Sequence, residues 1–355
     1  MKPLSERIQA RIIDAHNTIL QTMKRMDNCR VKSLLVFEQD RFLGLITNGD
    51  LQRAIIAKQS FETEIKALVD NNKKKYASVS DDEDSIKTWM MEVRAEMMPI
   101  LGDKGRLENV IFWEDLFEES REDNRETIDI PVVIMAGGKG SRLKPLTNVL
   151  PKPLIPIGEK TILEEIMDRF EAVGCQKFYM SVNYKADMMR YYIEQLEHKY
   201  DITFFEESKP LGTIGSVSLL KGKINTPFFV SNCDIIIDQD YRDVYDYHIT
   251  NKNDLTIVSA IKSIKIPYGV IETGDDGLMT ELHEKPEVTY MINSGVYILN
   301  PECINEIPQN EFYHITHLMK KIQKRGGRIG CFPVSEQAWT DMGEWQGYMK
   351  VAKIL

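Results

Sequence analysis

Apolar runs of strand length alternate with amphipathic stretches of helix length in the middle of this chain. In chain order, they cover residues 131–135, 161–172, 177–182, 186–197 and 227–231. Gly158 stands before the first helix-like stretch and Gly174 just after it, as is common at helix boundaries. Strands that alternate with helices at this spacing predict βαβ units, a parallel sheet and right-handed crossovers.

The first third of the chain repeats one order of elements: helix, strand, strand, helix. The first copy is predicted at residues 18–26, 33–37, 42–47 and 50–57, and the second at residues 85–92, 98–102, 110–113 and 115–119. Two copies of about fifty residues or fewer predict a paired module.

A charged stretch without glycine, residues 118–127, separates these two parts and cannot contribute to a core. A chain of 355 residues is long enough for two domains. We therefore expect a smaller domain over residues 1–122 and a larger one over residues 123–355.

Composition excludes several classes of protein. The chain is 43% hydrophobic and 28% charged, which is typical of a globular protein, and its net charge of −9 without a basic stripe predicts no nucleic-acid partner. The five scattered cysteines form no zinc pattern and are expected to be reduced. No apolar run approaches the length of a signal peptide's core or a membrane span, so we expect no membrane association and a cytoplasmic location.

The candidate chemistry begins directly after the apolar run that ends at Ala136. The next residues read Gly-Gly-Lys-Gly-Ser-Arg over 137–142, and Gly137, Gly138 and Gly140 let the backbone turn sharply and approach a ligand closely. Free N–H groups there, with Lys139 and Arg142 nearby, could surround the phosphates of a triphosphate. A plain glycine turn is the structural alternative. The spacing fits neither GxGxxG nor GxxxxGK[ST], which disfavours a Rossmann dinucleotide site or an ATPase P-loop.

Lys152 lies between Pro151 and Pro153, which we expect to hold it on a stiff, extended backbone. A fixed ammonium group beside a triphosphate can neutralise charge that develops as pyrophosphate leaves. Together, the glycine segment, including Ser141, and the Pro-Lys-Pro element resemble the signature of the sugar-1-phosphate nucleotidyltransferase family. This resemblance implies an α/β domain with a Rossmann-like, mixed but mostly parallel sheet.

The resemblance continues in order to the end of the chain. It implies that Gly212 and Thr213 contact the nucleotide base, that Asp234 and Asp341 bind Mg²⁺, and that Lys285 holds the sugar phosphate. It also places Gly269, Glu284 and Asn293 on the sugar-phosphate side. Cys233 departs from the family pattern, which often has a smaller residue there.

These residues also have structural explanations. Asp234 and Asp341 could cap turns, Lys285 could be a solvated surface lysine, and Arg142 could pair with a nearby carboxylate.

The implied reaction is an in-line attack by a sugar phosphate oxygen on the α-phosphorus of a nucleoside triphosphate. Catalysis would depend on positioning and charge neutralisation and would need no covalent nucleophile. The residues expected to provide this are Arg142, Lys152, Asp234 and Lys285. A phosphate monoester is already largely ionised at pH 7, so no general base is needed and His283 is interpreted as a surface or packing residue.

The expected substrates are GTP and a hexose or amino-hexose 1-phosphate, such as mannose or glucosamine 1-phosphate. The Pro-Leu-Gly-Thr segment at residues 210–213 resembles that of guanylyltransferases. CTP, UTP and dTTP remain open. So do a catalytically inactive regulatory protein and a kinase or ATPase, which would release phosphate or ADP in place of pyrophosphate.

The first domain resembles an α+β pair of cystathionine-β-synthase (CBS) repeats. Residues 44–53 match the family's strand-to-helix element, which implies that Thr47 and Asp50 contact the ribose of an adenine nucleotide. In the second copy, an aromatic residue replaces the threonine and Asp115 is kept. A ligand-free spacer or dimerisation module is the alternative, and we expect a homo-oligomer in either case.

Overall fold

The computed structural model describes residues 6–70, 74–93, 95–116, 126–196 and 200–352. The chain divides into two compact units, Met1–Arg125 and Glu126–Leu355. Residues 118–125 of the charged stretch expected to be a linker lie outside the described residues. No helix in the described part of the chain is both long and apolar enough to cross a membrane.

Unit 1 contains two small sheets of the same design. Its elements are α1 (Glu6–Gln9), β1 (Ile12–Asp14), α2 (Ile19–Cys29), β2 (Ser33–Glu38), β3 (Arg41–Thr47), α3 (Asn48–Ile56), η1 (Ile65–Leu68), β4 (Ala77–Ser78), α4 (Glu83–Val93), β5 (Met97–Leu101), η3 (Asp103–Gly105), β6 (Leu107–Phe112) and α5 (Trp113–Leu116). In the sheets β1-β2-β3 and β4-β5-β6, the first pairing is parallel and the second antiparallel. The predicted order of helix, strand, strand and helix is therefore confirmed in both halves, although the last helix is described only up to Leu116.

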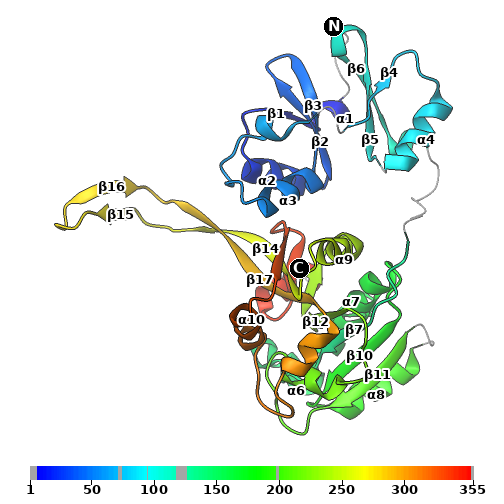
Figure 1. Ribbon diagram of the computed structural model, residues 1–355, viewed down its shortest axis with the longest axis vertical. Helices are drawn as coiled ribbons and strands as arrows, with labels where there is room; N and C mark the ends of the chain where they lie inside the picture. The colour runs from blue at the N-terminus through cyan, green and yellow to red at the C-terminus, as the bar shows by residue number, and fades with distance from the viewer. Residues whose placement is uncertain (1–5, 71–73, 94, 117–125, 197–199, 353–355) are drawn as a thin grey trace. The chain divides into compact units, whose positions relative to one another are not determined.

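Unit 2 is built around one large sheet (Figure 1). Its elements are β7 (Val132–Met135), η4 (Ser141–Leu143), α6 (Leu146–Val149), η5 (Lys152–Leu154), β8 (Pro156–Ile157), β9 (Lys160–Thr161), α7 (Ile162–Glu171), β10 (Lys177–Val182), α8 (Ala186–Gln195), β11 (Asp201–Glu206), η6 (Gly215–Leu220), β12 (Phe228–Asn232), β13 (Ile235–Ile237), α9 (Tyr241–Thr250), β14 (Leu255–Lys265), β15 (Val270–Thr273), β16 (Met279–His283), β17 (Glu287–Leu299), η7 (Pro301–Glu306), α10 (Ile315–Lys324), β18 (Ile329–Val334), β19 (Trp339–Asp341) and α11 (Trp345–Ala352).

The sheet has the strand order β11-β10-β7-β12-β17-β14-β18. Only β17 is antiparallel to its two neighbours, β12 and β14, and the other pairings in this sheet are parallel. This mixed, mostly parallel sheet confirms the expected fold class of unit 2. The apolar and amphipathic runs predicted over residues 131–231 all form the expected elements.

Helices cover both faces of the sheet because successive strand residues point to opposite sides. Val132 and Ile134 of β7 pack into a core with α7, α8, α9 and α11, whereas Val133 packs into a second core with η6, η7 and α10. Helices and loops cover both faces of the sheet, so a ligand site can form at the ends of the strands, where the loops begin.

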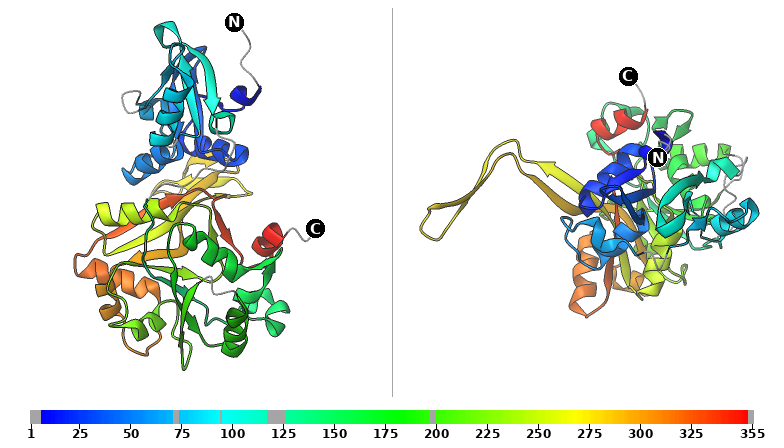
Figure 2. Two further views of the ribbon diagram at one scale, coloured as in Figure 1. Left: turned by 90° about the vertical axis from the view of Figure 1, so that its right-hand side faces the viewer. Right: turned by 90° about the horizontal axis from the view of Figure 1, so that it is seen from above.

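An arm of two strands, β15 and β16, projects away from the body of unit 2 (Figures 1 and 2). It continues the ribbon that begins with the pairing of β14 and β17, and Val270 lies opposite His283 at its inner end. Apolar side chains on it, such as Ile271 and Leu282, are 60% and 54% exposed. The sequence pattern did not predict this arm.

Candidate active site

A cavity of about 360 Å³ opens at the carboxyl ends of the sheet's parallel strands. Ligands of open α/β sheets commonly bind at such an edge. The residues that line it are Met135, Gly137, Gly138, Gly140, Ser141, Arg142, Lys152, Glu207, Pro210, Leu211, Gly212, Thr213, Asn232, Cys233, Asp234, Phe312 and Gly343. Residues from six separate segments therefore meet here.

The glycine segment forms one wall of the cavity. Gly140 has a φ of 60°, and a Cβ atom on it would lie 2.8 Å from Thr147 Cγ2 and 3.0 Å from Lys152 Cβ. Gly137 faces Glu207, whose Oε1 would lie 3.0 Å from such an atom. Ala136 is buried behind the cavity, where its N–H donates to the Ser181 carbonyl at 3.0 Å. The glycines thus keep the wall thin enough for a ligand to approach the backbone.

The backbone at Lys152 differs from the prediction. Pro151 is extended, but Lys152 begins the 3-10 turn η5, in which the Leu154 and Ile155 N–H groups donate to the Pro151 and Lys152 carbonyls at 2.9 and 3.1 Å. The prediction of an extended lysine was wrong because a proline's fixed φ also suits the start of a helical turn. The two prolines can still make this turn rigid, as expected.

Lys152 and two aspartates converge on one point. The Lys152 ammonium donates to Asp234 Oδ2, and the two side chains are 8% and 13% exposed. Asp341 reaches the same place because β19 pairs with β13, which brings Asp341 opposite Ile235. A Cβ atom on Gly343 would lie 2.7 Å from one carboxylate oxygen of each aspartate and 2.9 Å from Lys152 Nζ. The structure therefore gathers three of the predicted residues around one small gap.

Arg142 lies at the rim of the cavity. Its Nη1 donates to Glu344 Oε1 at 3.0 Å, and the side chains of both residues are more than half exposed. The pairing with a carboxylate that was considered as a structural explanation is thus present. An exposed ion pair is weak, so the guanidinium can also contact a bound phosphate.

Gly212 and Thr213 line the opposite wall. Gly212 has a φ of 82°, and a Cβ atom there would lie 2.7 Å from the Tyr313 carbonyl oxygen. Thr213 Oγ1 accepts from the Ile315 N–H at 2.9 Å and so helps to fix the start of α10. Both residues shape the wall through contacts with the segment before α10.

Glu207 is a candidate residue that the sequence analysis missed. It is 5% exposed, and its carboxylate accepts from the Leu211 N–H at 3.0 Å and from the Ser181 hydroxyl. Each carboxylate oxygen can accept two hydrogen bonds, so acceptor capacity remains. In the sequence, it is one of two adjacent glutamates with no distinguishing pattern.

Cys233 is also buried beside Asp234. Burial, with a contribution from the Asp234 carboxylate, raises the pKa of the Cys233 thiol to about 12. The thiol therefore stays protonated near neutral pH.

The residues expected on the sugar-phosphate side do not line this cavity. Glu284 and Lys285 are about 70% and 68% exposed at the inner end of the arm, beside Gly269. Asn293 lies on β17, where its Oδ1 accepts from the Gly295 N–H at 3.2 Å. Lys285 thus has the exposure of a solvated surface lysine.

In unit 1, the two copies hold their aspartates in the same way. Thr47 and Asp50 form a capping box at the start of α3, with the Thr47 N–H donating to Asp50 Oδ2 at 2.8 Å. In the second copy, the Phe112 N–H donates to Asp115 Oδ2 at 3.0 Å. Phe112 therefore occupies the place of Thr47, as the sequence alignment of the copies predicted.

Asp50 is also paired with a cation. Lys74 Nζ donates to Asp50 Oδ2 at 2.6 Å. Burial pushes the pKa of Asp50 upward, but hydrogen bonds from Lys74 and Thr47 outweigh it and hold the pKa below its ordinary value. Asp50 is accordingly a charged, partnered carboxylate near neutral pH.

Comparisons with known proteins show the family to which unit 2 is similar. The family model described as "Nucleotidyl transferase" matches residues 131–355. A mannose-1-phosphate guanyltransferase of Pichia angusta is 38% identical over 228 residues, which are 61% of this chain and 62% of that protein. The same enzyme of Saccharomyces cerevisiae is 35% identical over 184 residues, or 49% of this chain and 51% of that protein. The chain thus spans between about half and three fifths of the length of these curated relatives.

Solved structures share the fold. The crystal structure of HddC from Yersinia pseudotuberculosis covers 63% of this chain and 98% of its own, with 28% identity and a TM-score of 0.51. A putative glucose-1-phosphate thymidylyltransferase from Bacillus anthracis has a TM-score of 0.51 at 21% identity, covering 63% of this chain and 94% of its own.

Proposed function

Since this chain belongs to the nucleotidyl transferase family, we propose that unit 2 transfers a guanylyl group from GTP to a hexose or amino-hexose 1-phosphate and releases pyrophosphate. The observation that carries this proposal is the convergence of Lys152, Asp234 and Asp341 at one edge of a cavity whose wall is the glycine segment. A cation and two carboxylates beside a glycine segment suit a triphosphate with a bound cation.

We propose that a magnesium ion binds in the gap beside Gly343. Two carboxylate oxygens face one point there, and hard oxygen ligands are what Mg²⁺ prefers. We propose that Asp234 and Asp341 hold it. When bound, Mg²⁺ would screen the charges of the phosphates that approach one another.

In the proposed reaction, an oxygen of the sugar phosphate attacks the α-phosphorus of GTP. A new P–O bond forms, the bond to the β-phosphate oxygen breaks, and pyrophosphate leaves with that electron pair. The attacking oxygen is already ionised, so no proton has to move. Lys152 is placed to neutralise charge at the α-phosphate, and Arg142 to bind the outer phosphates.

Glu207 supports guanine as the base. Guanine carries two adjacent donor groups on one edge, N1–H and N2–H₂, and a carboxylate can accept from both. Glu207 is buried in the wall between Gly137 and Leu211 and retains acceptor capacity. Mannose-1-phosphate guanyltransferases among the relatives agree with this choice.

For the sugar phosphate, we propose Lys285 as the binding cation, with Gly269, Glu284 and Asn293 beside the sugar. This part of the proposal rests on the family resemblance of these positions.

The test is a pyrophosphate-release assay with Mg²⁺, in which GTP, CTP, UTP, dTTP and ATP are each offered with a panel of hexose and amino-hexose 1-phosphates. We expect the highest kcat/KM with GTP and one class of sugar phosphate, and loss of release in Asp234→Asn. A higher kcat/KM with another nucleotide would revise the base, whereas phosphate or ADP as the product would indicate a kinase or ATPase. Silence across the panel would favour a regulatory protein.

For unit 1, we propose a CBS pair that binds an adenine nucleotide at the first copy. Its duplicated helix-strand-strand-helix order and the capping box of Thr47 and Asp50 support this function. We expect ATP, ADP or AMP to raise the melting temperature of the chain and to alter pyrophosphate release, and both effects to weaken in Asp50→Ala. No response to any of the three nucleotides would leave unit 1 as a spacer or a dimerisation module. A mass measurement in solution would then show whether the chain forms a homo-oligomer.

A further inference from the structure

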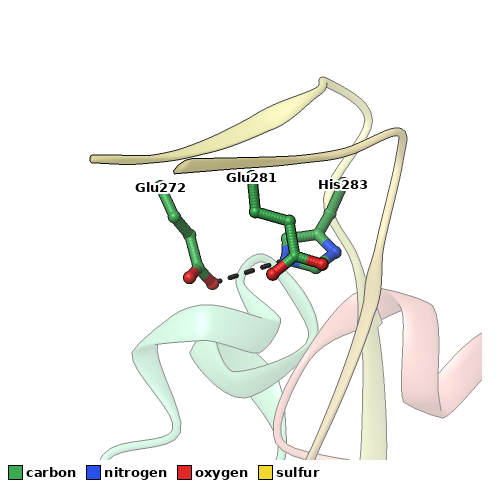
Figure 3. A group of neighbouring side chains, drawn as sticks. All are labelled: Glu272, Glu281 and His283. Atoms are coloured by element: carbon green, nitrogen blue, oxygen red, sulfur yellow. Dashed lines mark ion pairs between the residues drawn. The ribbon is translucent and has the colours of Figure 1, made fainter. Parts of the chain in front are cut away.

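Three side chains on the arm of unit 2 face one another across its two strands (Figure 3). Glu272 lies on β15, and Glu281 and His283 lie on β16. Glu272 is directly opposite Glu281 in the strand register, and His283 is two residues further along the same strand, so all three share one face of the ribbon.

The distances from the imidazole to the two carboxylates match those between neighbouring ligands of a small divalent ion. His283 Nε2 lies 3.4 Å from Glu272 Oε1 and 3.5 Å from Glu281 Oε2, and the three ligand atoms lie within 4.8 Å of one another. Zinc binds imidazole nitrogen and carboxylate oxygen at about 2.0 to 2.2 Å, which puts neighbouring ligands of a tetrahedral site about 3.3 to 3.6 Å apart. The same ring nitrogen faces both carboxylates, as a shared ion requires.

A bound cation at this place would also stabilise the arm. Two carboxylates directly opposite each other on paired strands repel and destabilise the pair. An isolated two-stranded hairpin is marginally stable in water, and this one has large apolar residues exposed. The register of the two strands also shifts between Glu272 and Thr273, next to the cluster. A bulge of this kind redirects the side chains beside it.

We infer that Glu272, Glu281 and His283 bind a divalent transition-metal ion of the Zn²⁺ class, which joins the two strands of the arm. One imidazole and two carboxylates favour such an ion over Mg²⁺, which prefers oxygen ligands throughout. The three side chains are between 40% and 61% exposed, so water can complete the coordination. This site is separate from the carboxylates of Asp234 and Asp341, and it does not depend on the proposed transfer reaction.

The chain offers a matched control in unit 1. His16 also contacts two glutamates, but its Nδ1 lies 2.9 Å from Glu64 and its Nε2 lies 3.5 Å from Glu38. The carboxylates therefore face opposite nitrogens of the ring and cannot share one ion with it. His16→Ala therefore disrupts an exposed cluster of one histidine and two glutamates without changing the arm.

The experiment is a calorimetric titration of the metal-free full chain with Zn²⁺, with excess Mg²⁺ present to occupy any site that prefers it. We expect one Zn²⁺ site per chain whose affinity falls at least about tenfold in His283→Ala and in Glu272→Gln, and stays unchanged in His16→Ala. Zn²⁺ should also slow proteolytic cleavage between residues 270 and 283 in the wild-type chain but not in His283→Ala. Two arm variants are used in case one of them misfolds, and circular dichroism checks that both are folded.

Equal zinc affinity in the wild-type chain and both arm variants would overturn the inference, as would the absence of a zinc site in the wild-type chain. Either result would leave ordinary surface ion pairs on the arm. Pyrophosphate release is not part of the readout, so failure here is distinct from failure of the proposed function.

Discussion

Lys152 donates a hydrogen bond to the carboxylate of Asp234, and both side chains are largely shielded from solvent. A buried ammonium group and a buried carboxylate are tolerated because each compensates the other. Asp234 fixes the position of the Lys152 ammonium at the cavity edge, and a positive group positioned in advance stabilises developing negative charge without reorganisation.

The first prediction concerns that charge. Lys152→Met keeps most of the length of the side chain but removes the ammonium group, so pyrophosphate release should fall by about 10² to 10³-fold in kcat. Lys221→Met, at an exposed lysine outside the cavity, should retain activity. Steady-state kinetics of both purified variants provide the measurement, and a Lys152→Met enzyme with normal kcat would refute the role of Lys152.

The second prediction concerns the metal. Asp341→Asn removes one of the two charged ligands proposed for Mg²⁺, so the Mg²⁺ concentration for half-maximal activity should rise by at least about tenfold. The control is Asp238→Asn, because this carboxylate follows β13, the strand that pairs with β19, is 85% exposed and contacts Arg169 at 3.5 Å. If the two variants need the same amount of Mg²⁺, Asp341 is no ligand and only caps the turn, through the hydrogen bond that its Oδ1 accepts from the Gly343 N–H at 2.6 Å.

The third prediction tests the glycine wall. In Gly140→Ala, the new methyl group meets Thr147 and Lys152 at a left-handed φ, so the free energy of unfolding should fall by about 1 to 2 kcal/mol or more. Gly138→Ala is the matched control for stability, because no atom lies within 4 Å of a Cβ there and its φ is not left-handed. Chemical denaturation followed by circular dichroism measures both. Equal losses would mean that the contacts around Gly140 relax at little cost.

Much of this site could be predicted from the sequence because its segments are short and local. The strand before Gly137, the glycine turn and Asp234 at the end of β12 each follow from apolar runs that end in polar or flexible residues. The mostly parallel sheet then brings those ends to one edge. Lys152 lines the cavity with the glycine segment, but its backbone conformation differs from the predicted one, since a proline on each side permits both an extended segment and a tight turn.

Other parts depend on contacts between distant segments and left no local pattern. Glu207 is buried only because Ser181 and Gly137 lie beside it, on segments distant in sequence. The arm consists of short strands whose apolar residues stay exposed, so alternation does not reveal a buried face. Its cluster at Glu272 and His283 forms only when the two strands pair.

The fourth prediction concerns acid sensitivity of unit 1. The pKa of Asp50 is depressed in the folded chain by Lys74 and Thr47 despite burial. Its contribution to stability is therefore complete above the ordinary pKa of an aspartate, near 4, and is lost as the pH falls through the lower folded value. Asp50→Asn should remove this part of the acid sensitivity.

Hydrogen exchange of the α3 segment measures this effect, after correction for the intrinsic rate at each pH. Protection in the wild-type chain should fall between about pH 5 and pH 3, and more steeply than in Asp50→Asn. Asp40→Asn, at an exposed carboxylate of the same unit, should follow the wild-type profile. Identical profiles for all three chains would mean that the ion pair with Lys74 adds no stability.

The last prediction concerns the choice of base at Glu207. Glu207→Gln replaces one carboxylate oxygen with an amide donor, so guanine loses a charged acceptor for its N1–H and N2–H₂ groups. Hydrogen bonds to charged groups contribute about 1.5 to 3 kcal/mol, so kcat/KM for GTP should fall by about 10 to 10²-fold relative to UTP. The neighbouring Glu206 provides the control, because it is exposed and pairs with Arg190 at 3.0 Å outside the cavity, and Glu206→Gln should keep the wild-type ratio. A parallel loss with both nucleotides would show that Glu207 supports the wall through Ser181 and Leu211 without reading the base, whereas a loss confined to GTP assigns base selection to its carboxylate.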